Sequence, residues 1–131
     1  MAHFPTNVDG LDMTRQPDQL ESLRAQVGAF AAERDWEQFH NPKNLAMAVA
    51  AEAGELIEHF QWLTPDEAAH LSAAAREEVA LEAADVLLFL VRLCDKLDID
   101  LGAAAARKLA LNAKKYPVAK SRGRATKYTK L

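Results

Sequence analysis

The stretch NLAMAVAAEAGELIEHFQWL, residues 44–63, decides the fold because it reads as one amphipathic helix. Its apolar residues recur every three or four positions, which is the period of an α-helix. Glu52 falls inside the apolar arc of this helix, Glu55 falls at its edge, and Glu58 faces the other way. An unpaired buried carboxylate is costly, and like charges one turn apart repel by roughly 0.2–0.5 kcal/mol. The first two glutamates therefore need a partner.

A later segment, EEVALEAADVLLFLVRLCDKL, repeats this arrangement. It is apolar nearly all round over residues 79–93, which predicts a central, buried helix. Glu82 lies among the apolar residues, Asp85 lies at their edge, and Glu78 is one turn before Glu82 on the same side. If the two helices pack antiparallel, the two acidic pairs converge.

Converging carboxylates cannot all stay ionised without a counter-charge. Oxygen-preferring divalent cations are the natural partners, so the pattern predicts a site for Mg²⁺, with Mn²⁺ as a substitute. Mg²⁺ usually completes its shell with waters and substrate phosphates. The alternative is that Glu52 and Glu82 pair with Arg or Lys from neighbouring helices.

The rest of the chain predicts an all-α fold, because no segment alternates apolar and polar residues as a strand would. Helices are expected over residues 17–35, 42–62, 73–97 and 101–115, with a short one after Thr64, in a bundle with antiparallel neighbours. Predicted N-caps are Asn41, Thr64 with Glu67 in a capping box, Ser72 and Asp100. Residues 1–16 read as a leader, 17–116 as the domain, and 117–131 as a basic C-terminal arm.

The charge distribution is sharply divided. Residues 1–100 hold all 19 acidic residues and 7 of the 16 basic ones, and residues 101–131 hold the other 9 basic residues. This favours an acidic metal site served by a basic phosphate-binding end, or a basic tail for an anionic polymer. The lone Cys94, read as a small buried hydrophobe, excludes an internal disulfide. No apolar run suits a membrane span and no signal peptide is recognised, so a cytoplasmic protein is expected.

Several segments together resemble the MazG-like all-α NTP pyrophosphatases, and most closely the dCTP pyrophosphatase branch. These are the E-x-x-E and E-x-x-D pairs, FAAERDWEQFHNPKNLAMAVAAEAGELIEHFQWL, EAADVLLFLV, KLALNAKKYP and the terminal KYTKL. The resemblance covers about residues 20–131. It implies that a metal-activated water attacks the α-phosphorus of a nucleoside triphosphate, releasing a monophosphate and pyrophosphate. It also implies a homo-oligomer, dimer or tetramer, that completes the bundle and has its sites near subunit contacts.

The resemblance assigns roles residue by residue. Glu52, Glu55, Glu82 and Asp85 would bind Mg²⁺, and Glu55 is our candidate to accept the proton of the water. The candidate substrate-binding residues are Trp36, His40, Trp62 and Phe89 for the base and sugar, and Lys108, Asn112, Lys115 and Tyr116 for the triphosphate. His59 suits either a site role or a surface role.

Two departures from the branch affect specificity. The branch often has His where this chain has Val27, and Tyr where it has Phe89, so two polar groups are missing from the expected pocket wall. This weakens the expectation of strict cytosine preference and leaves the metal chemistry untouched. The biological task would be nucleotide-pool control or sanitation.

Two other function classes stay open. A di-iron carboxylate bundle needs Glu-x-x-His motifs, and Glu37–His40 and Glu67–His70 have that spacing, although neither shares a helix face with the acidic pairs. A non-enzymatic binding module would use the basic tail on nucleic acid, but the tail offers little aromatic stacking and the buried acids would be unexplained.

Overall fold

The structure, a computed structural model, describes residues 18–131, and all regular secondary structure in this range is helical. The elements are α1 (Gln19–Glu33), α2 (Pro42–Glu58), α3 (Pro65–Ala69), α4 (Ala73–Lys96), α5 (Leu101–Lys115), α6 (Val118–Ser121) and a 3-10 turn η1 (Tyr128–Lys130). The all-α prediction is confirmed. The predicted leader, residues 1–16, and Pro17 lie outside the described residues.

The helix starts follow from side-chain caps. Asn41 accepts a hydrogen bond from the backbone N–H of Asn44 at 2.9 Å, and Pro42 occupies the first helical position. Thr64 and Glu67 form the reciprocal capping box that the sequence predicts. Such caps satisfy backbone donors that the first helical turn leaves free. The predicted caps Ser72 and Asp100 are confirmed in the same way at α4 and α5, and Asp18 caps α1.

The predicted end of the second helix was wrong by about one turn. α2 ends at Glu58, and residues 59–62 form tighter turns instead of continuing to Trp62. There the N–H of His59 bonds to the carbonyl of Leu56, three residues back. Apolar periodicity cannot reveal such a change, because a tightened last turn keeps nearly the same residues on the same face.

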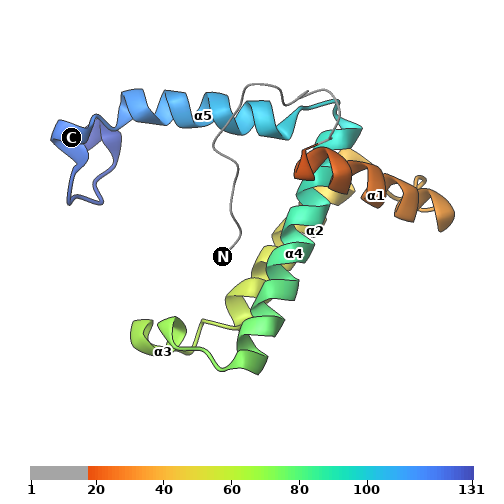
Figure 1. Ribbon diagram of the computed structural model, residues 1–131, viewed down its shortest axis with the longest axis horizontal. Coiled ribbons are helices and arrows are strands. Elements are labelled where there is room, and N and C mark those ends of the chain that lie inside the picture. The colour runs from red at the N-terminus through yellow and green to blue at the C-terminus, as the bar shows by residue number, and fades with distance from the viewer. Residues whose placement is uncertain (1–17) are drawn as a thin grey trace, which may run out of the picture.

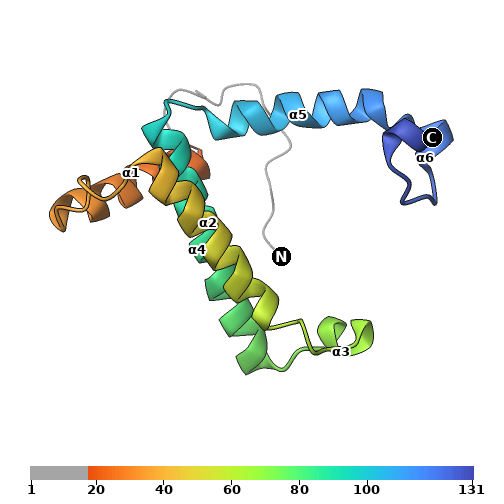
Figure 2. The same cartoon turned by 180° about the vertical axis from the view of Figure 1, so that it is seen from behind.

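The helices α2 and α4 lie side by side and run in opposite directions, with α1 packed across the C-terminal end of α4 (Figures 1 and 2). The buried apolar residues are few and gather at this end: Ala31, Leu45, Val91 and Cys94. The prediction that Cys94 is a buried hydrophobe is confirmed. The antiparallel pairing is the condition that brings the two acidic pairs together.

In the single chain α4 is less buried than its apolar sequence predicts. Only α2 and α1 pack extensively against it, so Leu81 remains 59% exposed. The helix α5 does not fold back as an antiparallel neighbour but extends away from the α2–α4 pair (Figure 1), and its Leu109 is 71% exposed. The bundle is therefore open within one chain, since nothing in residues 18–131 covers these apolar faces, and its completion by an oligomer stays a prediction.

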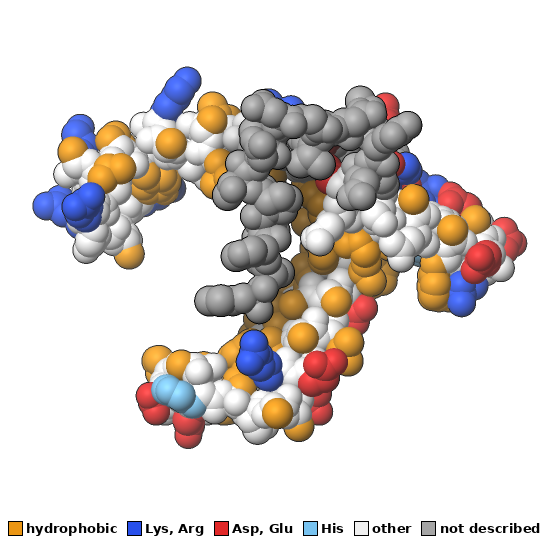
Figure 3. Space-filling model, viewed as in Figure 1, with side chains coloured by type: hydrophobic (Ala, Val, Ile, Leu, Met, Phe, Trp, Pro, Cys, Tyr) orange, Lys and Arg blue, Asp and Glu red, His pale blue; other side chains and the backbone are white. Residues whose placement is uncertain are grey.

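The basic end of the chain is structured. Basic side chains gather at the far end of α5 and beyond it, whereas acidic side chains line α1, α3 and the lower part of α4 (Figure 3). Tyr116 packs edge-on against Tyr128 with ring centroids 5.9 Å apart, and the ammonium of Lys115 lies 5.0 Å from the Tyr128 ring centre. The segment expected as an arm thus folds against the end of α5. Within residues 18–131, no helix has the length and apolar character that crossing a membrane requires.

Candidate active site

Three carboxylates meet where α2 faces α4. Glu52 comes from α2, and Glu82 and Asp85 come from successive turns of α4. One oxygen of each lies within 4.8 Å of the others. The three-residue spacing puts both α4 carboxylates on the side that faces α2, and antiparallel packing brings Glu52 opposite them. We call these three residues the acidic cluster.

The acidic cluster lacks positive charge. Glu52 Oε2 and Glu82 Oε2 are buried and have no hydrogen-bond partner. Burial raises the pKa of Glu52, and the charges of Glu55, Asp85 and Glu82 raise it further. Among residues 18–131, no Arg or Lys forms an ion pair with Glu52 or Glu82, so the ion-pair alternative is not supported.

Two neighbours complete the surroundings of the acidic cluster. Glu55 is exposed at the edge of the acidic cluster, and its charge contributes to the raised pKa of Glu52. It is not among the three residues whose carboxylate oxygens lie within 4.8 Å of one another. His59 lies beside the acidic cluster: its Nε2 lies 3.8 Å from Glu82 Oε1 and its Nδ1 3.9 Å from Glu78 Oε2. These distances are too long for hydrogen bonds. Of the two roles left open for His59, the structure thus favours a place beside the site.

A cavity of about 540 Å³ opens next to the acidic cluster, between α1, the α1–α2 connection and α4. It is lined by Leu23, Gln26, Val27, Phe30, Trp36, His40, Asp85, Leu88, Phe89 and Arg92. Trp36 packs edge-on against Phe30 and His40, with ring centroids 5.7 and 6.0 Å apart. Asp85 belongs to both the cavity and the acidic cluster, so a ligand in the cavity reaches the carboxylates. The sequence-predicted residues Trp36, His40 and Phe89 share this cavity wall.

Sequence reasoning missed a buried charge beneath this cavity. Arg92 is only 4% exposed, and its guanidinium donates to Glu37, to Asp95 at 3.1 Å and to His40 Nδ1 at 3.2 Å. Glu37 also accepts from Lys96. These ion pairs hold the pKa of Glu37 below its ordinary value. The available signal was one arginine inside the otherwise apolar run VLLFLVRLC.

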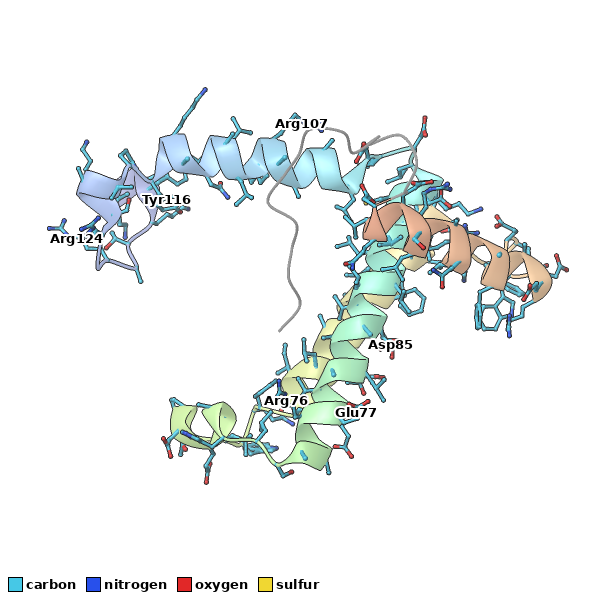
Figure 4. The ribbon with its side chains drawn as sticks, in the orientation of Figure 1. Arg76, Glu77, Asp85, Arg107, Tyr116 and Arg124 are labelled. Carbon is cyan, nitrogen blue, oxygen red and sulfur yellow. The ribbon has the colours of Figure 1, made fainter. Side chains whose placement is uncertain are left out.

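Other sequence-predicted substrate residues are not brought to the cavity within one chain. Trp62 follows α2 at its far end and is 86% exposed. Lys108, Asn112 and Lys115 lie along α5, and Tyr116 is its C-cap. Figure 4 shows Asp85 on α4 and Tyr116 at the distant end of α5, on separate arms of the molecule. Their assigned roles stay predictions.

Two competing interpretations lose support here. The carboxylate of Glu37 is engaged by Arg92 and Lys96, and Glu67 is engaged in its capping box. Neither Glu-x-x-His motif therefore supplies a free ligand pair for di-iron. The acidic cluster also has no role in a nucleic-acid-binding module, which leaves that interpretation unsupported.

Known proteins provide an independent comparison. The MazG-like family model matches residues 47–131. The dCTP pyrophosphatase 1 of Bos taurus is 46% identical over 114 residues, covering 86% of this chain and 68% of the bovine protein. The dCTP pyrophosphatase 1 of Homo sapiens is 45% identical over 114 residues, covering 86% of this chain and 67% of the human protein.

A solved structure agrees with these relatives. A pyrophosphatase from Archaeoglobus fulgidus superposes with a TM-score of 0.73 at 38% sequence identity, covering 78% of this chain and 95% of that one. Sequence and fold lead to the same assignment. The chain belongs to the MazG-like family.

Proposed function

We propose that this chain is a nucleoside triphosphate pyrophosphohydrolase that converts a (d)NTP and water into a (d)NMP and pyrophosphate, with dCTP or a modified dCTP preferred. The acidic cluster beside an aromatic cavity carries this proposal, since Asp85 joins the two. A nucleobase in the cavity would direct its phosphates toward the carboxylates. The names of the bovine, human and archaeal relatives support the reaction and the base.

The residues of the acidic cluster fit a divalent cation. They offer three carboxylate oxygens within 4.8 Å, and the buried Oε2 atoms of Glu52 and Glu82 have no partner. Glu52, Glu82 and Asp85 would hold the ion, with Glu55 as a fourth candidate. We infer Mg²⁺, with Mn²⁺ as a substitute, from the all-oxygen donors. Such an ion, when bound, neutralises phosphate charge and lowers the pKa of water.

The chain's own side chains divide the remaining tasks. Glu55 is exposed beside Glu52, so its carboxylate is available to accept a proton from the attacking water. Trp36, His40 and Phe89 take the base, where an aromatic face stacks on a nucleobase. Val27 and Phe89 leave the wall less polar than in the dCTP branch, which favours tolerance of modified bases.

The triphosphate-binding role of α5 requires a second copy of the chain. Lys108 and Asn112 lie away from the acidic cluster, and the leucines of α5 are exposed. A dimer or tetramer would cover these leucines and the exposed face of α4, while bringing basic residues toward the acidic cluster of another copy. We propose residues 17–116 as the catalytic domain and 117–131 as a basic arm. A cytoplasmic task in nucleotide-pool control suits this substrate.

The test is a substrate panel. The pure protein is incubated with Mg²⁺ and each common dNTP, each NTP and 5-methyl-dCTP, and the products are separated. Monophosphate plus pyrophosphate is the expected result, with the cytosine nucleotides ranked first. Release of diphosphate plus phosphate, or no turnover by folded protein with metal present, would contradict the proposal. Omission of the metal should abolish turnover.

A further inference from the structure

Arg92 is a buried charge that the proposed reaction does not use. It stands alone among apolar residues of α4 and is 4% exposed. A buried charge is tolerated only where its hydrogen bonds are satisfied. Both terminal nitrogens of Arg92 have hydrogen-bond partners, because Nη2 donates to Glu37 and Nη1 donates to Asp95. The third donor, Nε, is directed at His40.

The contact with His40 determines where the imidazole proton is. A guanidinium has only donors, so the bond from Arg92 Nε to His40 Nδ1, 3.2 Å long, requires a lone pair on Nδ1. A neutral imidazole that accepts at Nδ1 carries its proton on Nε2. Partial burial and the charge of Arg92 both lower the pKa of His40, in keeping with a neutral ring.

The guanidinium is held in this orientation by shared acceptors. Glu37 also accepts from Lys96, and Asp95 also accepts from Arg24 at 3.2 Å. Each carboxylate is thus tied to a second cation, and Arg92 cannot turn away from His40 without breaking these pairs. Two partners with fixed positions preorganise the Nε donor.

We propose that Arg92 is a positioning residue that locks His40 in its Nε2–H tautomer, so that His40 presents a hydrogen-bond donor to the nucleobase in the cavity. His40 lines the cavity, and its Nε2 has no partner among residues 18–131. All three donor nitrogens of Arg92 already have acceptors, so Arg92 itself has no donor nitrogen left for a ligand. Of the two residues Arg92 and His40, only His40 therefore offers a ligand a free donor, at Nε2.

The chemistry of the ligand follows from this donor. A carbonyl oxygen or an unprotonated ring nitrogen can accept from Nε2–H, and cytosine offers both on one edge. An exocyclic amine cannot accept, so it is disfavoured at this position. Val27 and Phe89 contribute no polar group, so His40 Nε2–H is one of the few donors of the cavity wall, beside those of Gln26 and Trp36. The ligand part of the inference rests on the proposed function, whereas the tautomer does not.

The first test reads the tautomer in the whole, unliganded protein. Histidine is labelled with ¹⁵N, and long-range ¹H–¹⁵N spectra are recorded at neutral pH; His40 is identified among the four histidines by its loss in His40→Gln. We expect an unprotonated Nδ1 and a protonated Nε2. In Arg92→Met the preference should be lost. A proton on Nδ1 in the wild type, or an unchanged tautomer in Arg92→Met, would overturn the proposal.

The second test measures dCTP hydrolysis. Arg92→Met should raise KM about tenfold, the usual effect of one hydrogen bond, and change kcat less than about twofold. Arg76→Met is the control, because Arg76 is an exposed arginine of the same helix that lies outside the contacts of Arg92 and His40. It should leave both the tautomer and KM unchanged. An equal rise of KM in the control would overturn the specific role of Arg92.

A third comparison does not depend on the folding of Arg92→Met. The amide nitrogen of Gln reaches the place of Nε2, whereas that of Asn reaches the place of Nδ1, so His40→Gln should raise KM for dCTP less than His40→Asn does. Equal KM values in the two variants would overturn the donor role. Absence of dCTP hydrolysis by the wild type would contradict the proposed function and the ligand assigned here, and the spectra would still decide the role of Arg92.

Discussion

The two charged regions on α4 differ in how their charges are satisfied. Towards the C-terminal end, the ion-pair network of Glu37, Arg92, Lys96, Asp95 and Arg24 gives every carboxylate a cationic partner. About two turns earlier on α4, Glu82 and Asp85 join Glu52 of α2 in the acidic cluster, whose three carboxylates have no Arg or Lys partner among the described residues. One helix therefore carries a satisfied polar region and an unsatisfied one.

We interpret this difference as one between a structural region and the proposed reactive region. The ion-pair network joins α1, the α1–α2 connection and α4, and it lowers the pKa of Glu37. The acidic cluster instead raises the pKa of Glu52, which means that the fold bears an electrostatic cost there. A cost of this kind persists where a ligand relieves it. The variants below test whether this contrast holds.

The largest effect is expected from removing a charge of the acidic cluster. Glu52→Gln should lower turnover at least about a hundredfold, because a cation contributes several kcal/mol to transition-state stabilisation. The same variant should make the metal-free protein slightly more stable, by no more than about 1 kcal/mol. Steady-state kinetics and urea unfolding without metal measure the two effects.

The sign of that stability change follows from the pKa of Glu52. A carboxyl whose pKa is raised by folding destabilises the fold when ionised, and the stability is regained as the pH falls below that pKa. Gln removes the charge and this pH dependence. Glu58→Gln, on the exposed side of α2, is the control and should change neither quantity. Full activity of Glu52→Gln would refute the metal-site assignment.

Metal binding should counter the electrostatic cost of the acidic cluster. Mg²⁺ at about a hundredfold excess over its Kd should raise the Tm of the wild type by about 5–10 °C, since binding to the native state alone adds about 2.7 kcal/mol. Asp85→Asn should show a much smaller rise. Calorimetry with and without Mg²⁺ provides the measurement, and an equal rise in both proteins would place the ion elsewhere.

A smaller effect should show whether a second copy supplies the missing positive charge. Lys108→Ala should raise KM for dCTP about tenfold with little change in kcat, because it removes one charge-assisted contact to phosphate. Arg107→Ala, next to it on α5, is the matched control. When the Lys108→Ala and Glu52→Gln chains are mixed, some sites should combine the intact acidic cluster of one chain with Lys108 of the other. Activity at low substrate concentration should then rise above the average of the two variants. Simple averaging of the two activities would indicate that each site lies within one chain.

The smallest effect is expected in the ion-pair network. Folding lowers the pKa of Glu37 below 4.5, so its ion pairs add stability that is present above that value and is lost as the pH falls through the lowered pKa. Glu37→Gln should therefore be less stable than the wild type at neutral pH, and the difference should shrink as the pH falls below 4.5. Urea unfolding across this range measures it. The control, Glu33→Gln at the exposed end of α1, should change stability little. A loss of stability in Glu37→Gln that stays constant with pH would refute the ion-pair account.

Local signals predicted most of the fold. Asn41, Thr64, Ser72 and Asp100 were identified as caps because a capping side chain acts on a backbone group three residues away, which sequence spacing reveals. The helix that follows Pro42 was identified by periodicity, although its end at Glu58 was not. The missed ion-pair network joins residues far apart in the chain, so no local spacing could pair Arg92 with Glu37.

The sequence alone determined helices α1 to α5, the capped starts of α2 to α5 and the two acidic pairs, because these depend on contacts within a few residues. The resemblance of its motifs led to the MazG-like family. Only the tertiary structure decided that Glu52 meets Glu82 and Asp85, that Trp36, His40 and Phe89 share one cavity, and that α5 stands apart. These depend on the crossing of helices, where burial and hydrogen bonding link side chains that are distant along the chain. The tautomer of His40 follows from the same long-range packing, since Arg92 acts on it from another helix.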